Sequence, residues 1–157
     1  MAYGFTIENL EVNYHEFEPL YRQHYGEMAE RLAKQDIQIA PYNPNTKDYF
    51  AFANSGGLIH YCVRLDSKAV GYSNIYIFND MHNGTLSAQE DTIYLLPEHR
   101  NGTGRLFSKF ILADLKSRGV QSLTVTAMTD LRVEKLWKRM GFKPMATTMK
   151  YEFERAS

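Results

Sequence analysis

A glycine-containing turn between a predicted strand and a predicted helix constrains this chain more than any other feature. The turn lies within PEHRNGTGRLF, residues 97–107, and follows the β-rich run EDTIYLL. Gly102 and Gly104 have no side chain to pack, and they let backbone N–H groups point into one cavity. The helix that follows adds its unpaired first N–H groups and the positive end of its dipole. Such a turn suits a diphosphate, although a plain strand-to-helix connection explains the same residues.

Two common phosphate-binding motifs do not match this turn. A Walker A loop requires a Gly-Lys-Ser/Thr run, which the sequence lacks. A Rossmann fingerprint requires a third glycine, and Phe107 stands at that position. The turn therefore needs a different explanation.

The rest of the chain predicts a mixed sheet with helices packed against it. Periodicity and turn residues indicate strands at 4–7, 58–65, 69–80, 90–96, 122–128 and 145–154. Helices are expected at about 16–34, from Thr46 to the Gly56-Gly57 pair, at 106–119, and from 130 to Gly141. Asn13, Thr46, and Asp130 or Thr129 are the predicted N-caps. Strands first, then strand–helix–strand–helix–strand, is an α+β order without linkers, so we predict a single domain over residues 1–157.

The composition excludes several classes of partner. Lys and Arg total 18, as do Asp and Glu, so no overall basic charge favours nucleic acid. The single cysteine, Cys62, excludes an internal disulfide and fits a reducing compartment. No signal peptide or membrane-length apolar run is found, and the five histidines lack metal-ligand spacing. We therefore expect a cytoplasmic protein with no metal site and no nucleic-acid or membrane partner.

The turn resembles the acyl-CoA pyrophosphate loop of the GNAT superfamily of N-acyltransferases. IYLLPEHRNGTGRLFSKFILADLKSRGV follows that family's order of strand, Arg-led glycine turn and amphipathic helix, in a style close to phage-borne members. LWKRMGF, residues 136–142, is similar to the family's C-terminal helix that ends in Gly-Phe. The resemblance implies an α+β (α/β/α) GNAT fold. Its sheet would be mixed and mostly antiparallel, with a parallel, splayed central strand pair and about four helices.

The resemblance also implies which residues bind acetyl-CoA. The diphosphate would be held by the backbone of the turn and the pantetheine arm by the end of the preceding strand, whose N–H would polarise the thioester carbonyl. Asp130 stands where many members carry an Asn that contacts the cofactor arm, and Trp137 stands where the family usually has a Tyr acid. The implied cofactor residues are Leu95, Leu96, Arg100, Asn101, Gly102, Thr103, Gly104, Arg105, Asp130 and Trp137.

Acetyl transfer to an amine also needs a base, because an alkylammonium is charged near neutral pH. Asp91 occupies the register of the family's strand carboxylate, with Glu90 beside it, and adjacent strand residues face opposite sides. We favour Asp91 as the base, against the alternative that both acids are merely solvated. An indole N–H is not a useful proton donor, so Trp137 is expected to pack. Tyr94 is one tyrosine that could donate a proton instead, along with Tyr72, Tyr76 and Tyr25.

The sequence thus predicts an N-acetyltransferase that moves an acetyl group from acetyl-CoA to a primary amine by direct attack in a ternary complex. One rival is a catalytically silent GNAT-fold binding or structural protein, for instance of a phage; another is a nucleotide-binding module. The acceptor would be a small molecule or a protein amine, in a pocket built by residues 34–57 and 78–90. A homodimer is one assembly to test, and a phage-encoded chain would act in the host cytoplasm.

Overall fold

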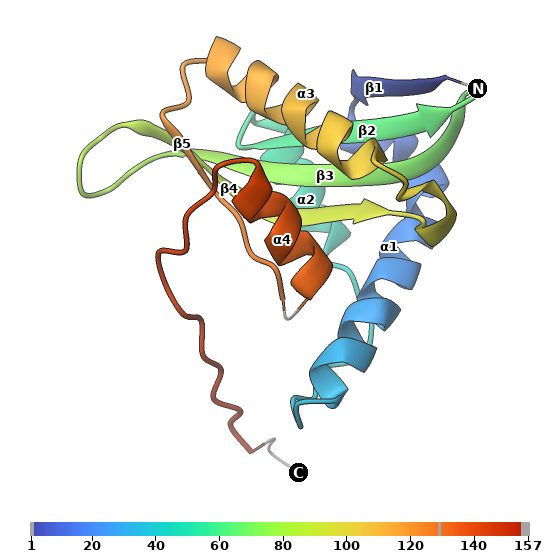
Figure 1. Ribbon diagram of the computed structural model, residues 1–157, viewed down its shortest axis with the longest axis vertical. Helices are drawn as coiled ribbons and strands as arrows, with labels where there is room; N and C mark the ends of the chain where they lie inside the picture. The colour runs from blue at the N-terminus through green and yellow to red at the C-terminus, as the bar shows by residue number, and fades with distance from the viewer. Residues whose placement is uncertain (1, 129, 155–157) are drawn as a thin grey trace.

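The computed structural model describes residues 2–128 and 130–154, and within them the chain forms one five-stranded sheet in the order β1-β2-β3-β4-β5 (Figure 1). Neighbouring strands from β1 to β4 are antiparallel, whereas β4 and β5 are parallel. The strands are β1 Tyr3–Ile7, β2 Leu58–Leu65, β3 Lys68–Asn79, β4 Leu86–Leu95 and β5 Ser122–Thr124. The predicted α+β class with a mixed, mostly antiparallel sheet is confirmed.

Helices cover both faces of the sheet. Figure 1 shows α3 and α4 on one face and α1 and α2 on the other. The helices are α1 Leu10–Ala33, α2 Thr46–Asn54, α3 Thr103–Ser117 and α4 Leu131–Arg139, with a short 3₁₀ turn, η1, at Pro97–His99. Because strand side chains alternate between faces, β2 sends Tyr61 and Val63 to the α3 core and Leu58 and Cys62 to the α1 core. None of the described helices is long and apolar enough to cross a membrane.

Two predicted N-caps are wrong. Helix α1 begins at Leu10, and Asn9 caps it by accepting a hydrogen bond from Val12 N at 3.0 Å. Asn13, the predicted cap, is buried inside the helix and donates through Nδ2 to Glu8 Oε1. Because this polar residue interrupts the apolar stripe, the apolar periodicity did not reveal the first turns of α1. Helix α2 is capped by Asn45 rather than by Thr46.

The C-terminal part of the sheet is smaller than predicted. β5 covers only Ser122–Thr124 instead of 122–128, and the predicted strand at 145–154 does not form. The alternating apolar residues of that segment, such as Met149 and Phe153, are exposed. An alternating pattern specifies a strand only when a neighbouring edge pairs with it, and in the described residues β5 pairs with β4 alone. The parallel pair therefore lies at the end of the strand order.

Two irregularities of β4 shape the site. The register with β3 shifts between Asn74 and Ile75: Asn74 pairs with Thr92 and Ile75 pairs with Glu90. Asp91, between them, is therefore the extra residue of a β-bulge. β5 pairs with β4 only from Ser87 to Gln89. Beyond that point the two strands separate, and the opening between them starts beside the bulge.

Candidate active site

A cleft of about 1650 Å³ crosses the molecule beside the opening between β4 and β5. One part, the loop half, is bounded by Leu95, Arg100, Gly102, Gly104 and Arg105. The other, the tyrosine half, lies between α1, α2, β3 and β4. The cleft brings together ten predicted site residues: Glu90, Asp91, Tyr94, Leu95, Arg100, Gly102, Gly104, Arg105, Asp130 and Trp137. Leu96, Asn101 and Thr103 are not part of its lining.

The loop half presents the start of α3. Gly102 precedes the helix with φ of 80°, a left-handed conformation that favours glycine, and no side chain caps the helix. The first N–H groups of α3, from Thr103 onward, therefore have no partner within the helix or from a capping side chain. The Arg105 side chain is exposed beside them. This end of the cleft is electropositive and suits an anionic group.

Arg100 is held by protein groups. Its Nε donates to Leu95 O at 2.9 Å and its Nη2 lies 3.1 Å from Glu27 Oε1 of α1. The guanidinium carbon also lies 5.4 Å from the centre of the Tyr94 ring. The Arg100 side chain therefore ties the end of β4 to α1, and the expected backbone contact of this residue with a diphosphate stays a prediction.

The two leucines that end the strand differ in their backbone roles. Leu96 N–H donates to Val70 O at 3.0 Å, so it is used within the sheet. Backbone groups alternate in direction along a strand, and Leu95 therefore directs its own N–H and C=O away from β3 and toward the opening. Leu95 packs over Gly71, where an added Cβ would lie 2.4 Å from Leu95 Cδ2. No role for Gly71 was predicted from the sequence. A glycine inside a predicted strand was the available indication, because it often marks a close approach by another group.

The two neighbouring acids both reach the cleft but differ in their surroundings. Glu90 is 7% exposed and lies on the side of α3 and Trp137, with its Oε1 3.5 Å from Thr126 N. Burial raises the pKa of Glu90 to about 7, and the Thr126 N–H opposes that shift. Asp91 opens into the tyrosine half, where the Tyr49 hydroxyl donates to its Oδ2. The surrounding protein raises the pKa of Asp91, and the Tyr49 hydrogen bond partly offsets this effect.

Tyr94, the predicted alternative acid, is bound to α1. Its hydroxyl donates to Glu27 Oε2, and its ring stacks on His24 with centroids 4.7 Å apart. Burial raises the pKa of Tyr94, and the Glu27 hydrogen bond raises it further. Burial also raises the pKa of Glu27, but the hydrogen bonds from Tyr94 and Arg100 lower it overall. The hydroxyl proton of Tyr94 is thus directed at an ionised carboxylate.

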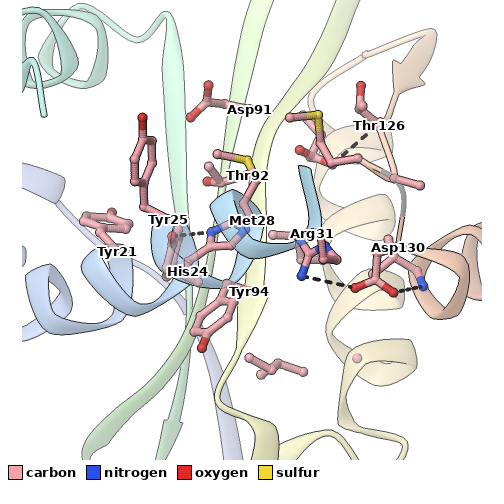
Figure 2. Close-up of a pocket in the computed structure, with 18 of the residues that line it drawn as sticks. Tyr21, His24, Tyr25, Met28, Arg31, Asp91, Thr92, Tyr94, Thr126 and Asp130 are labelled. Atoms are coloured by element: carbon pink, nitrogen blue, oxygen red, sulfur yellow. Dashed lines mark hydrogen bonds and ion pairs between the residues drawn. The ribbon is translucent and has the colours of Figure 1, made fainter. Parts of the chain in front are cut away.

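Asp130 and Trp137 lie on the α4 side of the cleft. The Asp130 carboxylate caps α4 by accepting from Arg132 N at 3.0 Å, and it lies 3.8 Å from Arg31 of α1 (Figure 2). Thr129, the other predicted cap, lies outside the described residues. Trp137 is 6% exposed and packs on Phe142 with ring centroids 4.9 Å apart. The helix cap from Asp130 is confirmed, and the geometry of Trp137 fits the packing role.

Sequence analysis missed most of the tyrosine half. Figure 2 shows Tyr21, His24, Tyr25 and Met28 of α1 lining the cleft near Asp91. His24 Nδ1 lies 2.8 Å from the Tyr72 hydroxyl, and burial lowers the pKa of His24 to about 4. Tyr25 was predicted as one candidate proton donor, whereas the spacing of Tyr21, His24 and Met28 predicted a helix and gave no sign of a site. Residues 40–44 line the cleft as expected, whereas 78–88 do not.

Comparison with known proteins places this geometry in a family. Residues 15–142 match the acetyltransferase (GNAT) family, whereas no curated protein sequence matches the chain. Ribosomal-protein-alanine N-acetyltransferase from Brucella melitensis biovar Abortus 2308 superposes with a TM-score of 0.72 at 17% identity, over 98% of this chain and 100% of that one.

Two further solved structures share the fold. AAC(6')-Iy, in complex with the bisubstrate analogue CoA-S-monomethyl-acetylneamine, superposes with a TM-score of 0.72 at 15% identity, covering 98% and 99% of the two chains. Glucosamine-6-phosphate N-acetyltransferase from Arabidopsis thaliana gives 0.67 at 9% identity, covering 98% and 100%. Identities this low show a shared fold, and the family match spans most of the sequence: the chain belongs to the acetyltransferase (GNAT) family.

Proposed function

We propose that this protein is an acetyl-CoA-dependent N-acetyltransferase that acts on a primary amine. The observation that carries the proposal is one continuous cleft with an uncapped helix N-terminus at one end and a carboxylate at the other. Between them lies the opening of β4 from β5, toward which Leu95 directs its N–H and the C=O that accepts from Arg100 Nε. This arrangement gives separate places for a diphosphate, an amide-containing arm and an ammonium.

The loop half fits acetyl-CoA, which supplies an activated acetyl thioester when bound. The α3 N-terminus and Arg105 would hold the diphosphate, because uncapped N–H groups and a helix dipole favour anions. An added Cβ at Gly104 would lie 3.6 Å from both Leu95 and Leu136, so this glycine keeps the space beside the leucines open. The Leu95 C=O, which also accepts from Arg100 Nε, would accept from an amide N–H of the pantetheine arm, and its N–H would stay free for the thioester.

The chemistry needs a proton acceptor and a stabilised carbonyl oxygen. Asp91 takes a proton from the ammonium, and the neutral amine nitrogen then attacks the thioester carbonyl carbon. A C–N bond forms, the C–S bond breaks, and the thiolate leaves and takes up the second proton that the nitrogen loses, while Leu95 N–H stabilises the carbonyl oxygen. A thiol with a pKa of about 8.5 is a tolerable leaving group, so Trp137 in place of a tyrosine acid does not prevent transfer.

A silent binding protein of the same fold is the second candidate. The Tyr94 hydroxyl is bound to Glu27 and Trp137 offers no acid, so neither supplies a proton to the thiolate. The proposal further takes residues 1–157 as one cytoplasmic domain, in a host cytoplasm if the gene is phage-borne. Size-exclusion chromatography with light scattering will decide between monomer and homodimer.

Thermal unfolding with acetyl-CoA tests the cofactor assignment. A ligand that binds only the folded state at 100 times its Kd stabilises that state by about 2.7 kcal/mol, so acetyl-CoA should raise the Tm clearly. Gly104→Val should abolish the rise, because the branched side chain would enter the space between Leu95 and Leu136. Gly26→Val, at a helical position with nothing within 4 Å, is the control. A rise with ATP but not with acetyl-CoA would favour the nucleotide-binding rival.

A further inference from the structure

The tyrosine half is walled by aromatic rings from three elements. Tyr21 comes from α1, Tyr49 from α2, and Tyr72 and Tyr76 from β3. We call these four residues the tyrosine wall. Tyr21 and Tyr72 meet edge to face with centroids 4.2 Å apart, and both are buried, so this part of the wall is rigid. The wall therefore offers preformed aromatic surface rather than flexible side chains.

A single carboxylate faces this wall. Asp91 accepts a hydrogen bond from the hydroxyl of Tyr49, a neutral group. Burial raises the pKa of every member of the tyrosine wall, and the negative charge of Asp91 raises each of them further. All four rings thus lie within the field of one acid. Glu90, the neighbouring acid, lies on the other side of the sheet beside Trp137.

The positive charges of the cleft are arranged elsewhere. Arg31 pairs with Asp130 at 3.8 Å, and Arg100 pairs with Glu27 at 3.1 Å. Arg105 lies at the loop half, and the remaining two arginines of the lining, Arg132 and Arg139, belong to α4, where Arg132 also pairs with Asp130 at 3.7 Å. In the part of the chain that the structure describes, no Lys, Arg or His forms an ion pair with Asp91. The charge of Asp91 is therefore available to a cationic ligand.

We infer that the acceptor is an arylalkylamine, a primary amine with one positive charge on a short chain that carries an aromatic ring. The ammonium would lie against Asp91 and over the faces of the nearby rings, where cation–π attraction acts within about 6 Å. The aromatic ring of the acceptor would pack edge-to-face or offset against the tyrosine wall. The inference rests on the proposed function and narrows its substrate.

The charges of the tyrosine half also disfavour other amine classes. A polyamine or an aminoglycoside carries several positive charges and is matched best by several acids, whereas one carboxylate faces this wall. A phosphorylated amino sugar needs a cationic anchor for its phosphate. The arginine of α1 that lines the cleft, Arg31, is paired with Asp130, so among the described residues the tyrosine half offers no unpaired arginine or lysine to a phosphate. These classes serve as competitors in the test.

Release of CoA thiol, measured with a panel of amines at fixed acetyl-CoA, tests the inference. The panel holds 2-phenylethylamine, n-propylamine, spermidine, kanamycin and glucosamine 6-phosphate. We expect kcat/KM for 2-phenylethylamine to exceed that of every other member roughly 10-fold or more, because even one methylene in an apolar pocket discriminates by roughly 10- to 200-fold and a ring is larger. Tyr76→Leu, at a half-buried position, should remove most of this preference by lowering kcat/KM for 2-phenylethylamine.

Tyr151→Leu is the matched control, because that ring is 79% exposed on the C-terminal segment. It should keep the preference for 2-phenylethylamine. A higher kcat/KM for spermidine, kanamycin or glucosamine 6-phosphate would overturn the inference and leave the proposed function standing. Equal values for 2-phenylethylamine and n-propylamine in the wild type would do the same. No transfer to any amine, with the Tm still raised by acetyl-CoA, would overturn both the substrate class and the transferase activity.

Discussion

The two halves of the cleft are built in different ways. The loop half uses backbone groups from one short run, residues 100–105, together with the end of the adjoining strand. The tyrosine half uses side chains from α1, α2, β3 and β4, which stand up to 70 residues apart between Tyr21 and Asp91. An anion site made of N–H groups needs little side-chain chemistry, whereas an amine site needs specific side chains brought together by the fold.

The halves also differ in charge. The loop half carries the positive end of α3 and the exposed Arg105, and the tyrosine half carries Asp91. An anionic donor and a cationic acceptor would thus be drawn to opposite ends of one cleft. The opening between β4 and β5 lies where the two meet. Variants in the two halves should therefore change different measurements: amine kcat/KM for the tyrosine half and acetyl-CoA affinity for the loop half.

Asp91→Asn should have the largest effect and should affect the acceptor alone. We expect kcat/KM for an amine to fall roughly 10²- to 10⁴-fold, the usual contribution of a general base. Acetyl-CoA affinity should change little, because Asp91 lies in the tyrosine half. Burial raises the pKa of Asp91, so wild-type kcat/KM should decrease as pH falls through that raised pKa, and this acid limb should vanish in the variant.

Glu90→Gln is the matched control for Asp91, since it changes the adjacent acid. Its effect on kcat/KM should be mild, because Glu90 lies beside Trp137 on the other face of β4. The reverse ranking would transfer the base to Glu90. Full activity in both variants would favour a base elsewhere or the silent binding protein.

The sequence predicted the loop half far better than the tyrosine half, and the comparison explains why. Gly102 and Arg105 act through local backbone geometry, which a short motif records. Tyr21 and Tyr49 become neighbours of Asp91 only through tertiary packing. Each stands in an apolar pattern along its own helix that is equally typical of a core. The same limit applies to Arg100, whose charge suggested a diphosphate although Glu27, 73 residues away along the chain, binds it.

The fold itself followed the same pattern. The strand bounds of β2 were predicted correctly because an apolar run flanked by turns is a local signal. The strand at 145–154 was predicted from alternation, but a strand also needs a pairing edge, which no local pattern reports. The bulge at Asp91 was missed for a similar reason, because it exists only relative to the register of β3.

Substitution of Trp137, which lies on the α4 side of the cleft, should change mainly the stability of the fold. Trp137→Ala should lower the free energy of unfolding by about 3–5 kcal/mol, because the ring is nearly fully buried. Trp137→Phe should keep most of kcat and lose less stability, as urea unfolding and CoA release will show. Trp137→Tyr should raise the rate at low pH if protonation of the leaving thiolate limits it there. Loss of turnover in Trp137→Phe with unchanged Tm and acetyl-CoA binding would contradict the packing role.

Glu90→Gln should stabilise the fold in a pH-dependent way. Burial raises the pKa of Glu90 to about 7 from a value near 4.5, so the folded state holds this proton more tightly than the unfolded chain. Wild-type stability therefore falls as pH rises from 4.5 to 7 and carries a cost of about 3 kcal/mol above that range, at about 1.4 kcal/mol per pKa unit. Urea unfolding at pH 5 and pH 8 should show the variant gaining mainly at pH 8. An equal gain at both pH values would mean that Glu90 is ionised normally in the fold.

Substitutions of Asp130 should have the smallest effect of those considered. They test whether the Asp130 side chain belongs to the loop half of the cleft. Asp130→Ala removes the α4 cap and should cost about 0.5–2 kcal/mol of unfolding free energy. Asp130→Asn keeps an oxygen that can cap the helix. It loses the ion pair with Arg31, which at 3.8 Å is loose and partly exposed and is worth about 0–1 kcal/mol. The Tm of Asp130→Asn should therefore stay near the wild-type value. Acetyl-CoA affinity, measured by calorimetry, should be the same for Asp130→Asn and wild type, because the carboxylate is occupied by the helix and by Arg31. A tenfold loss of affinity in Asp130→Asn at unchanged Tm would instead show that this carboxylate contacts the cofactor arm, and the loop half would then extend across the cleft to α4.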